Sequence, residues 1–177
     1  MTTLFAGVRK GDVALATLLT ALGVVLMVAD ITSDPEPGVR MDSQSWLMIP
    51  VFAAATLPIL WRRRNLLVVY GVTAAALAVH VLAFGWTVRC GAGLPLAFAL
   101  AYSSGRLSDR WESVAGLVAN VAVQALVLMQ DSAAGFDIIP VTAIIAALVW
   151  GIGTWLRRRS TLSAASQSTP ASTPSYV

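Results

Sequence analysis

Residues 57–82 read LPILWRRRNLLVVYGVTAAALAVHVL, two apolar runs joined by Arg62, Arg63, Arg64 and Asn65. The hydrocarbon layer of a bilayer is about 30 Å thick, so a spanning helix needs about 20 mostly apolar residues. The run after the turn has this length, and so short a turn returns the chain antiparallel to itself. The stretch therefore predicts a hairpin of membrane helices with its arginines at one membrane surface.

The composition of the whole chain agrees with lipid as its solvent. Of its 177 residues, 57% are hydrophobic and only 12% are charged, about half the charged fraction of a soluble domain. The net charge is +3, and the arginines stand in clusters beside apolar runs. We therefore expect the lipid bilayer and its anionic headgroups as the partner, and no nucleic acid.

Six apolar segments are predicted to span the membrane. They are residues 13–31, 46–61, 66–84, 93–104, 113–129 and 138–156. The first is longer than the apolar core of a signal peptide, and Met27-Val28-Ala29 is a poor cleavage site, which favours a retained helix. The fourth is short: either Arg89 belongs to its outer end and reaches the headgroups, or the segment is re-entrant.

The arginines predict the orientation, because positive residues accumulate on the cytoplasmic side. With six spans, ten of the twelve basic residues fall on one side and only Arg40 and Arg89 on the other. The turn of Arg62, Arg63 and Arg64 and a final group both fall on the basic side, and these two groups act as topology anchors. The final group is Arg157, Arg158 and Arg159. The predicted fold is all-α and polytopic, with six transmembrane helices and both termini cytoplasmic in the cell (inner or plasma) membrane.

Three regions follow from this topology. Residues 1–12 form a cytoplasmic N-terminus and residues 13–159 a six-helix membrane domain. Residues 160–177 are rich in Ser, Thr, Ala and Pro, a composition that predicts a disordered cytoplasmic tail.

The sequence lacks the motifs of common enzymes. It has no glycine-rich phosphate loop or dinucleotide fingerprint, and its one histidine and one cysteine cannot supply a usual zinc site or catalytic triad. We expect no catalytic residue, no metal and no cofactor.

Polar residues inside the predicted spans are the candidate functional sites, because each is costly in lipid. In the fifth span they share one face within an arc of about 80° at 100° per residue: Ser113, Gly116, Asn120, Gln124 and Asp131. This stripe is predicted to face the bundle interior. It either lines a path for a ligand or ion, or makes hydrogen bonds between helices.

Three further candidates lie on the third span and one on the first. His80 shares a face with Tyr70 and Thr73, so these three side chains either form a proton-sensitive pocket or make ordinary packing contacts. Asp30 ends the first span, where it is either a solvated carboxylate at the outer interface or an ion-coupling group.

Two stretches carry a resemblance to a known family. The run LPILWRRRNLLVVYGVTAAALAVHVL followed by CGAGLPLAFALAYSSGRLSDRW resembles the N-terminal membrane domain of actinobacterial sensor histidine kinases of the nitrate/nitrite-response type, and the closing GIGTWLRRR is similar to their exit from the membrane. In that family a coiled coil with a phosphoacceptor histidine and an ATPase domain follow. Here the sequence turns to Ser, Thr and Pro after Arg159, so we expect no phosphorylation by this chain.

Three functions are consistent with these features. The first is a sensor-like input domain that acts by helix packing or partner binding, either as a homodimer or with a membrane kinase. The second is a small oligomeric permease or channel that uses the polar stripe, His80 and Asp30. The third is a remnant membrane domain with no current activity.

Overall fold

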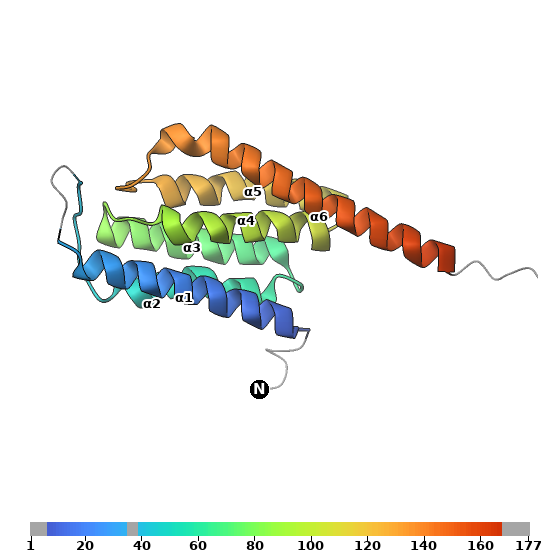
Figure 1. The fold of residues 1–177 in the computed structure, drawn as a ribbon, viewed down its shortest axis with the longest axis horizontal. Helices are drawn as coiled ribbons and strands as arrows, with labels where there is room; N and C mark the ends of the chain where they lie inside the picture. The colour runs from blue at the N-terminus through green and yellow to red at the C-terminus, as the bar shows by residue number, and fades with distance from the viewer. Residues whose placement is uncertain (1–6, 35–38, 168–177) are drawn as a thin grey trace, which may run out of the picture.

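The computed structural model describes residues 7–34 and 39–167, without the side chains of residues 164–167. Its fold is all-α (Figure 1), with six α-helices and two short 3₁₀ helices in the described part. The elements are α1 (Lys10–Thr32), α2 (Met48–Thr56), η1 (Leu57–Trp61), α3 (Leu66–Phe84), α4 (Cys90–Leu107), α5 (Arg110–Leu128), η2 (Phe136–Ile138) and α6 (Ile139–Gln167). The predicted all-α class with six helices is confirmed.

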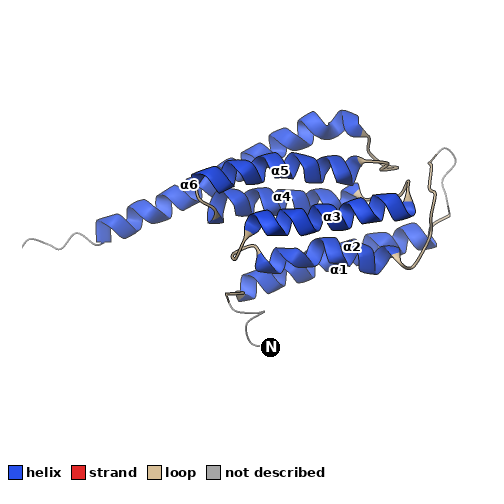
Figure 2. Ribbon diagram, turned by 180° about the vertical axis from the view of Figure 1, so that it is seen from behind, coloured by secondary structure: helices blue, strands red, loops and turns tan. Residues whose placement is uncertain are grey.

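The helices lie side by side along the long axis of the molecule (Figures 1 and 2). α1 packs on α2, η1 and α4, α3 packs on α2 and α5, and α4 packs on α5 and α6. We call the end at which α1 begins the terminal end. The opposite end, where α3 and α5 finish, is the loop end. α6 runs back from the loop end and extends past the other helices at the terminal end (Figure 1).

Four helical stretches are long and apolar enough to cross a membrane: α1, α3, α5 and residues 136–163. The stretch Met48–Trp61 is a shorter apolar helix, and α4 does not reach this standard. Large apolar side chains are exposed on the outward faces of the long helices, including Leu18, Leu82, Val118 and Leu148. So much exposed apolar surface is typical of contact with lipid. The chain therefore has the architecture of a multi-pass membrane protein, and the number of six crossings stays a prediction.

The second predicted span is not one continuous α-helix. It divides into α2 and η1 at Leu57, directly before Pro58 in the first turn of η1. Proline lacks the N–H that an α-helix needs and its ring clashes with the preceding turn, so the chain tightens into 3₁₀ geometry.

The fourth predicted segment, residues 93–104, is longer in the structure. α4 comprises 18 residues, which corresponds to about 27 Å of helix. The glycines and serines of α4 lower its mean hydropathy, so the apolar segment in the sequence is shorter than the helix. The glycines allow close packing: Gly93 lies against Val127, and Gly105 of α4 and Gly153 of α6 bring the two helix backbones together. A Cβ at Gly105 would overlap the carbonyl oxygen of Trp150.

The structure differs from the sequence prediction at residues 160–167, which were expected in a disordered tail. They continue α6 to Gln167. The side chains of Ser160, Thr161 and Ser163 donate hydrogen bonds to carbonyls three or four residues earlier, which is compatible with helix. Residues 168–177 of the predicted tail lie outside the described part.

Candidate functional site

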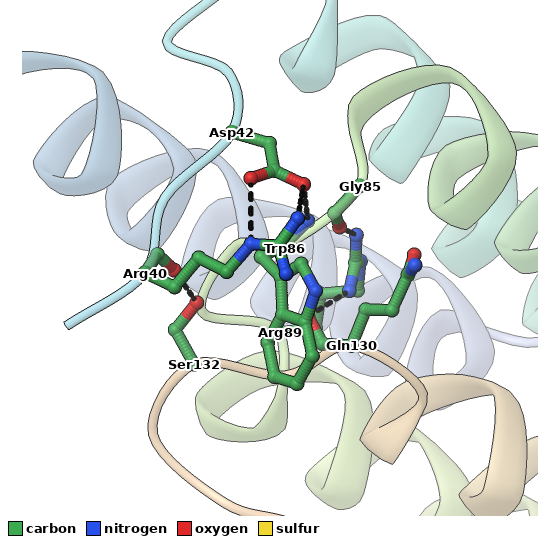
Figure 3. A network of polar contacts seen from close by, with 7 residues as sticks. All are labelled: Arg40, Asp42, Gly85, Trp86, Arg89, Gln130 and Ser132. Carbon is green, nitrogen blue, oxygen red and sulfur yellow. Dashed lines mark hydrogen bonds and ion pairs between the residues drawn. The ribbon is translucent and has the colours of Figure 1, made fainter.

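The three connections at the loop end are hydrogen-bonded to one another (Figure 3). The backbone N–H of Asp42, between α1 and α2, donates to the carbonyl of Trp86, between α3 and α4, at 2.9 Å. Thr87 then pairs with the α5–α6 connection, as its N–H donates to Gln130 and its carbonyl accepts from Ser132. We call these joined connections the loop-end clasp.

Arg89 lies at the centre of the clasp and is 0% exposed. Its Nε donates to Nδ1 of His80 at 3.0 Å. Its Nη1 donates to the carbonyls of Met129 and Gln130, each at 3.0 Å, and its Nη2 donates to the carbonyl of Gly85. One guanidinium therefore ties the end of α3 to the end of α5.

Helix ends explain why a cation is stable in this place. The last carbonyls of a helix have no partner within it and carry partial negative charge. α3 and α5 both finish at the loop end, so their free carbonyls converge on Arg89. Burial of a charge is costly without such partners. Here the guanidinium N–H groups of Arg89 donate to the carbonyls at the ends of α3 and α5.

Two buried carboxylates, Asp131 and Asp30, lie beside Arg89. One Asp131 oxygen accepts from the backbone N–H groups of Arg89, at 2.6 Å, and Cys90, at 2.7 Å, at the start of α4. Its other oxygen accepts from Ala133 and Ala134. Asp30, at the end of α1, accepts from the N–H of Val88 at 3.0 Å. An acid at a helix N-terminus is favourable, so Asp131 fixes α4 to the α5–α6 connection. We call Arg89, His80, Asp131 and Asp30 the Arg89 cluster.

The outer layer of the clasp is exposed. Arg40 donates to Asp42 with its Nε at 3.0 Å, and its guanidinium lies 5.4 Å from the Trp86 ring centroid. The hydrogen bond from Arg40, together with one from the Trp86 N–H, holds the pKa of the Asp42 carboxyl below its ordinary value. Gly85 has a φ of +62°, and a Cβ there would lie 2.6 Å from Asp42 Oδ2, so glycine is required for Asp42 to reach this place.

The predicted group of His80, Tyr70 and Thr73 is buried, but the structure gives each residue separate neighbours. His80 contacts Arg89 and the ring edges of Phe52 and Phe84. The Thr73 hydroxyl donates to the carbonyl of Ala55 at 3.1 Å. Tyr70 lies towards the terminal end, where its ring approaches Gly116. A single pocket made by these three residues is therefore not present among the described residues.

The polar stripe of α5 faces the bundle interior, in agreement with the predicted orientation. Ser113, Asn120, Gln124 and Asp131 are all at most 3% exposed. Ser113 accepts a hydrogen bond from Trp150 Nε1 at 2.8 Å. By contrast, the side-chain amides of Asn120 and Gln124 have no hydrogen-bond partner among the described residues. The predicted alternative of hydrogen bonds between helices therefore holds for Ser113 and not for the two amides.

Two alternatives that the sequence left open at the loop end do not fit the structure. Arg89 does not reach outwards but is enclosed, because the helix-end carbonyls offer it acceptors inside the bundle. Asp30 is not a solvated carboxylate, since it is only 9% exposed and accepts from the N–H of Val88 in the α3–α4 connection; its ion-coupling alternative stays a prediction.

The topology anchors occupy the terminal end. Arg62 and Arg63 both pair with Asp12, which is 0% exposed, at 2.7 and 2.8 Å. Arg158 and Arg159 are exposed on the extension of α6, and Arg159 stacks on Trp155 at 4.1 Å. Arg64 lines a neighbouring cavity with Arg9, and Arg157 lies on the same α6 extension.

Sequence reasoning missed Asp131 as a partner of α4 and Asp12 as a partner of the arginine turn. The partners in question, Arg89 and Cys90 for Asp131 and Arg62 for Asp12, lie at least 41 positions away in the sequence. One signal was available: each acid lies beside a predicted span end on the same side as the arginine region that it contacts.

Neither a family model, nor a curated protein, nor a solved structure matches the chain. Within residues 7–34 and 39–167, three or more His, Cys, Asp or Glu side chains do not gather in a way that could hold a metal ion. The site is therefore defined by its own geometry: a buried cation and two buried acids that join the end of α1 to the α3–α4 and α5–α6 connections.

Proposed function

We propose that the chain is a six-span membrane protein with both termini cytoplasmic, and that it works as a signal-input domain. In this proposal a change at the loop end alters the position of α6 at the terminal end. The protein acts by helix packing, not by catalysis. The resemblance of residues 57–82, 90–111 and 151–159 to sensor-kinase membrane domains supports the same interpretation.

One observation carries the proposal: α4 is attached to the loop-end clasp at its first residues and to α6 at its last residues. At the loop end, Asp131 binds the first N–H groups of α4 and Arg89 joins it to α3 and α5. At the terminal end, Gly105 and Gly153 bring α4 against the α6 backbone. A helix is stiff along its axis, so a shift at Arg89 reaches α6 without an intermediate loop.

α6 has the form of an output element. It is continuous over 29 residues and extends beyond the end of the bundle (Figure 1). A ligand or membrane property that favours one of two positions of α4 would shift the population of α6 positions accordingly.

Distance measurements between spin labels test this coupling in the full chain reconstituted in nanodiscs. In a Cys90→Ser background, labels are placed at Val68→Cys and Leu162→Cys, two exposed positions on α3 and α6. The variant Arg89→Gln releases the ends of α3 and α5. We expect the Val68–Leu162 distance distribution to shift or broaden by several ångströms.

The control is Arg40→Gln, which removes a charge from the exposed layer of the same clasp. Its label distances are expected to match those of the parent protein. Equal distance distributions for Arg89→Gln and the parent protein would contradict the proposal, because α6 would then be independent of the Arg89 cluster.

A second copy of the chain is the partner that α6 favours. Exposed apolar residues recur on α6 at alternating intervals of four and three: Val141, Ile145, Leu148, Ile152 and Trp155. This spacing is typical of paired helices. In the Cys90→Ser background, Leu148→Cys is expected to form a disulfide-linked dimer in native membranes. Leu18→Cys, equally exposed on α1, is expected to remain monomeric, and equal cross-linking of both would contradict a dimer through α6.

The unpartnered amides favour a second candidate function, a small permease. Buried side-chain atoms without partners in the described part lie on α3, α5 and the α3–α4 connection: His80 Nε2, Thr87 Oγ1 and both amide atoms of Asn120 and Gln124. Such groups could coordinate a polar solute between α3 and α5. Flux of small solutes into proteoliposomes, abolished by Asn120→Leu with Gln124→Leu, would support it. Absence of flux, or flux unaltered by the two changes, would exclude these residues from transport.

A further inference from the structure

A cavity at the terminal end is lined mainly by arginine. It has a volume of about 370 Å³ and lies between the start of α1, the turn after η1 and the last turns of α4. Four guanidinium and two hydroxyl side chains line it: Arg9, Arg62, Arg63, Arg106, Tyr102 and Ser103. Among the described residues, no carboxylate lines this space. We call it the arginine cavity.

One buried acid below the cavity organises two of these arginines. Asp12 Oδ1 accepts from Arg62 Nε at 2.7 Å, and Asp12 Oδ2 accepts from Arg63 Nε at 2.8 Å and from the N–H of Arg9 at 3.0 Å. Arg62 also donates to Ser103 at 3.2 Å. Both oxygens of Asp12 are thus engaged, and a single negative charge faces four positive ones. The arrangement fixes the side chains of Arg62 and Arg63 and leaves the cavity with an excess of positive charge.

The position of the cavity relates it to lipid. α1 and α3 are two of the candidate membrane spans, and they begin beside the cavity at Lys10 and Leu66. In a membrane, the ends of spans lie at the depth of the lipid headgroups. The cavity therefore opens where the phosphate groups of one leaflet are found.

We propose that the arginine cavity binds a phosphate group, carried by an anionic phospholipid of that leaflet or by a soluble phosphate compound. The planar fork of donors on arginine matches phosphate oxygens and is seldom replaced by lysine without loss. Arg63 is suited to this role because Asp12 holds its Nε while its side chain remains 30% exposed. This binding site goes beyond the proposed signalling function and does not depend on it.

The experiment uses the full chain in nanodiscs and measures its thermal unfolding. The first arm compares discs of phosphatidylcholine with discs that also contain phosphatidylglycerol. A second arm adds inorganic phosphate to the phosphatidylcholine discs. Stabilisation in the first arm alone identifies a lipid as the source, and stabilisation by inorganic phosphate identifies a soluble one. No stabilisation in either arm overturns the proposal.

Variants separate a built site from general surface charge. Arg63→Gln and Arg106→Gln are each expected to weaken binding of the stabilising phosphate compound, phosphatidylglycerol or inorganic phosphate, about tenfold, equivalent to ~1.4 kcal/mol. The matched control is Arg110→Gln, which removes an exposed charge at the same end but lies outside the cavity lining. Equal effects of all three would show that only bulk charge matters and would overturn the proposal.

Asp12→Asn gives a test of opposite sign. This change makes the region more positive but releases Arg62 and Arg63. If the cavity is a built site, the variant binds the phosphate group more weakly than the parent protein. Stronger binding would overturn the proposal in favour of simple charge attraction.

The Arg106→Gln variant keeps the test independent of the role of Asp12 in folding. Arg106 donates its hydrogen bond to Ser160 on α6, so this change leaves the pairs of Asp12 with Arg62 and Arg63 in place.

Discussion

Arg89 is stable inside the bundle because each of its three guanidinium nitrogens donates to an acceptor. The ends of α3 and α5 provide carbonyls, His80 provides a ring nitrogen, and the charges of Asp131 and Asp30 lie near enough to favour its cation. Removal of such a group leaves several buried acceptors without partners. Each of these costs about 1–3 kcal/mol.

We predict that Arg89→Gln lowers the free energy of unfolding by about 2–5 kcal/mol, since a buried guanidinium and its acceptors are separated. Arg89→Lys is not expected to restore it, because an ammonium group lacks the fork that reaches both helix ends. Thermal unfolding in mild detergent measures the effect. Arg40→Gln is the control, since its side chain is 67% exposed and exposed pairs contribute about 0–1 kcal/mol. A comparable decrease in the free energy of unfolding for Arg40→Gln and Arg89→Gln would contradict the stabilising role of the Arg89 hydrogen bonds.

Gly85 provides a second test at the residue scale. We expect Gly85→Ala to destabilise the protein by about 1–3 kcal/mol, because a side chain is strained at positive φ and its Cβ would collide with Asp42. Gly71→Ala is the matched control on α3, where a Cβ would meet nothing within 4 Å. There alanine is expected to be neutral or to stabilise by up to about 1 kcal/mol. Unfolding midpoints of the two variants decide the matter, and similar midpoints would contradict the prediction.

At the scale of elements, the contact of α4 with α6 depends on small residues. We predict that Gly153→Ala separates these two helices and destabilises the protein by about 1–3 kcal/mol, because its Cβ would lie 2.6 Å from the Tyr102 carbonyl oxygen. Gly151→Ala, two positions away on the same helix, meets nothing within 4 Å and is expected to be harmless. Unfolding midpoints and the Val68–Leu162 label distance report both outcomes. A harmless Gly153→Ala would refute the close crossing.

The sequence predicts the limits of a helix well where neighbouring residues in the sequence set them, and poorly where contacts with distant segments set them. α3 matches its predicted residues 66–84 because its limits are local: the side chain of Asn65 caps the first turn by accepting from Val68 N–H at 3.1 Å, and Gly85 ends the helix at positive φ. α4 has no such local marks. Its length and the burial of Arg89 arise from contacts with α5, α6 and the α5–α6 connection, which no single segment of sequence contains.

For the whole molecule, the topology is the central prediction. We expect reporter fusions after Arg64, Arg110 and Arg159 all to report the cytosol, and a fusion in the loop-end connection after Arg40 to report the opposite side. The physical reason is that arginines accumulate at the terminal end, and positive residues are generally retained on the cytoplasmic side of membrane proteins. A cytosolic signal after Arg40, or an external one after Arg159, would contradict six crossings.

The dependence of α4 on its neighbours has a consequence for biogenesis. In the six-span topology proposed above, a segment rich in Gly and Ser such as α4 gains little by entering lipid alone, so we predict that helices already in the bilayer assist its insertion. α6, on which α4 rests through Gly105 and Gly153, is synthesised after it. In that topology the ribosome completes α4 before α6 exists, so we expect the order of assembly in the membrane to differ from the order of translation.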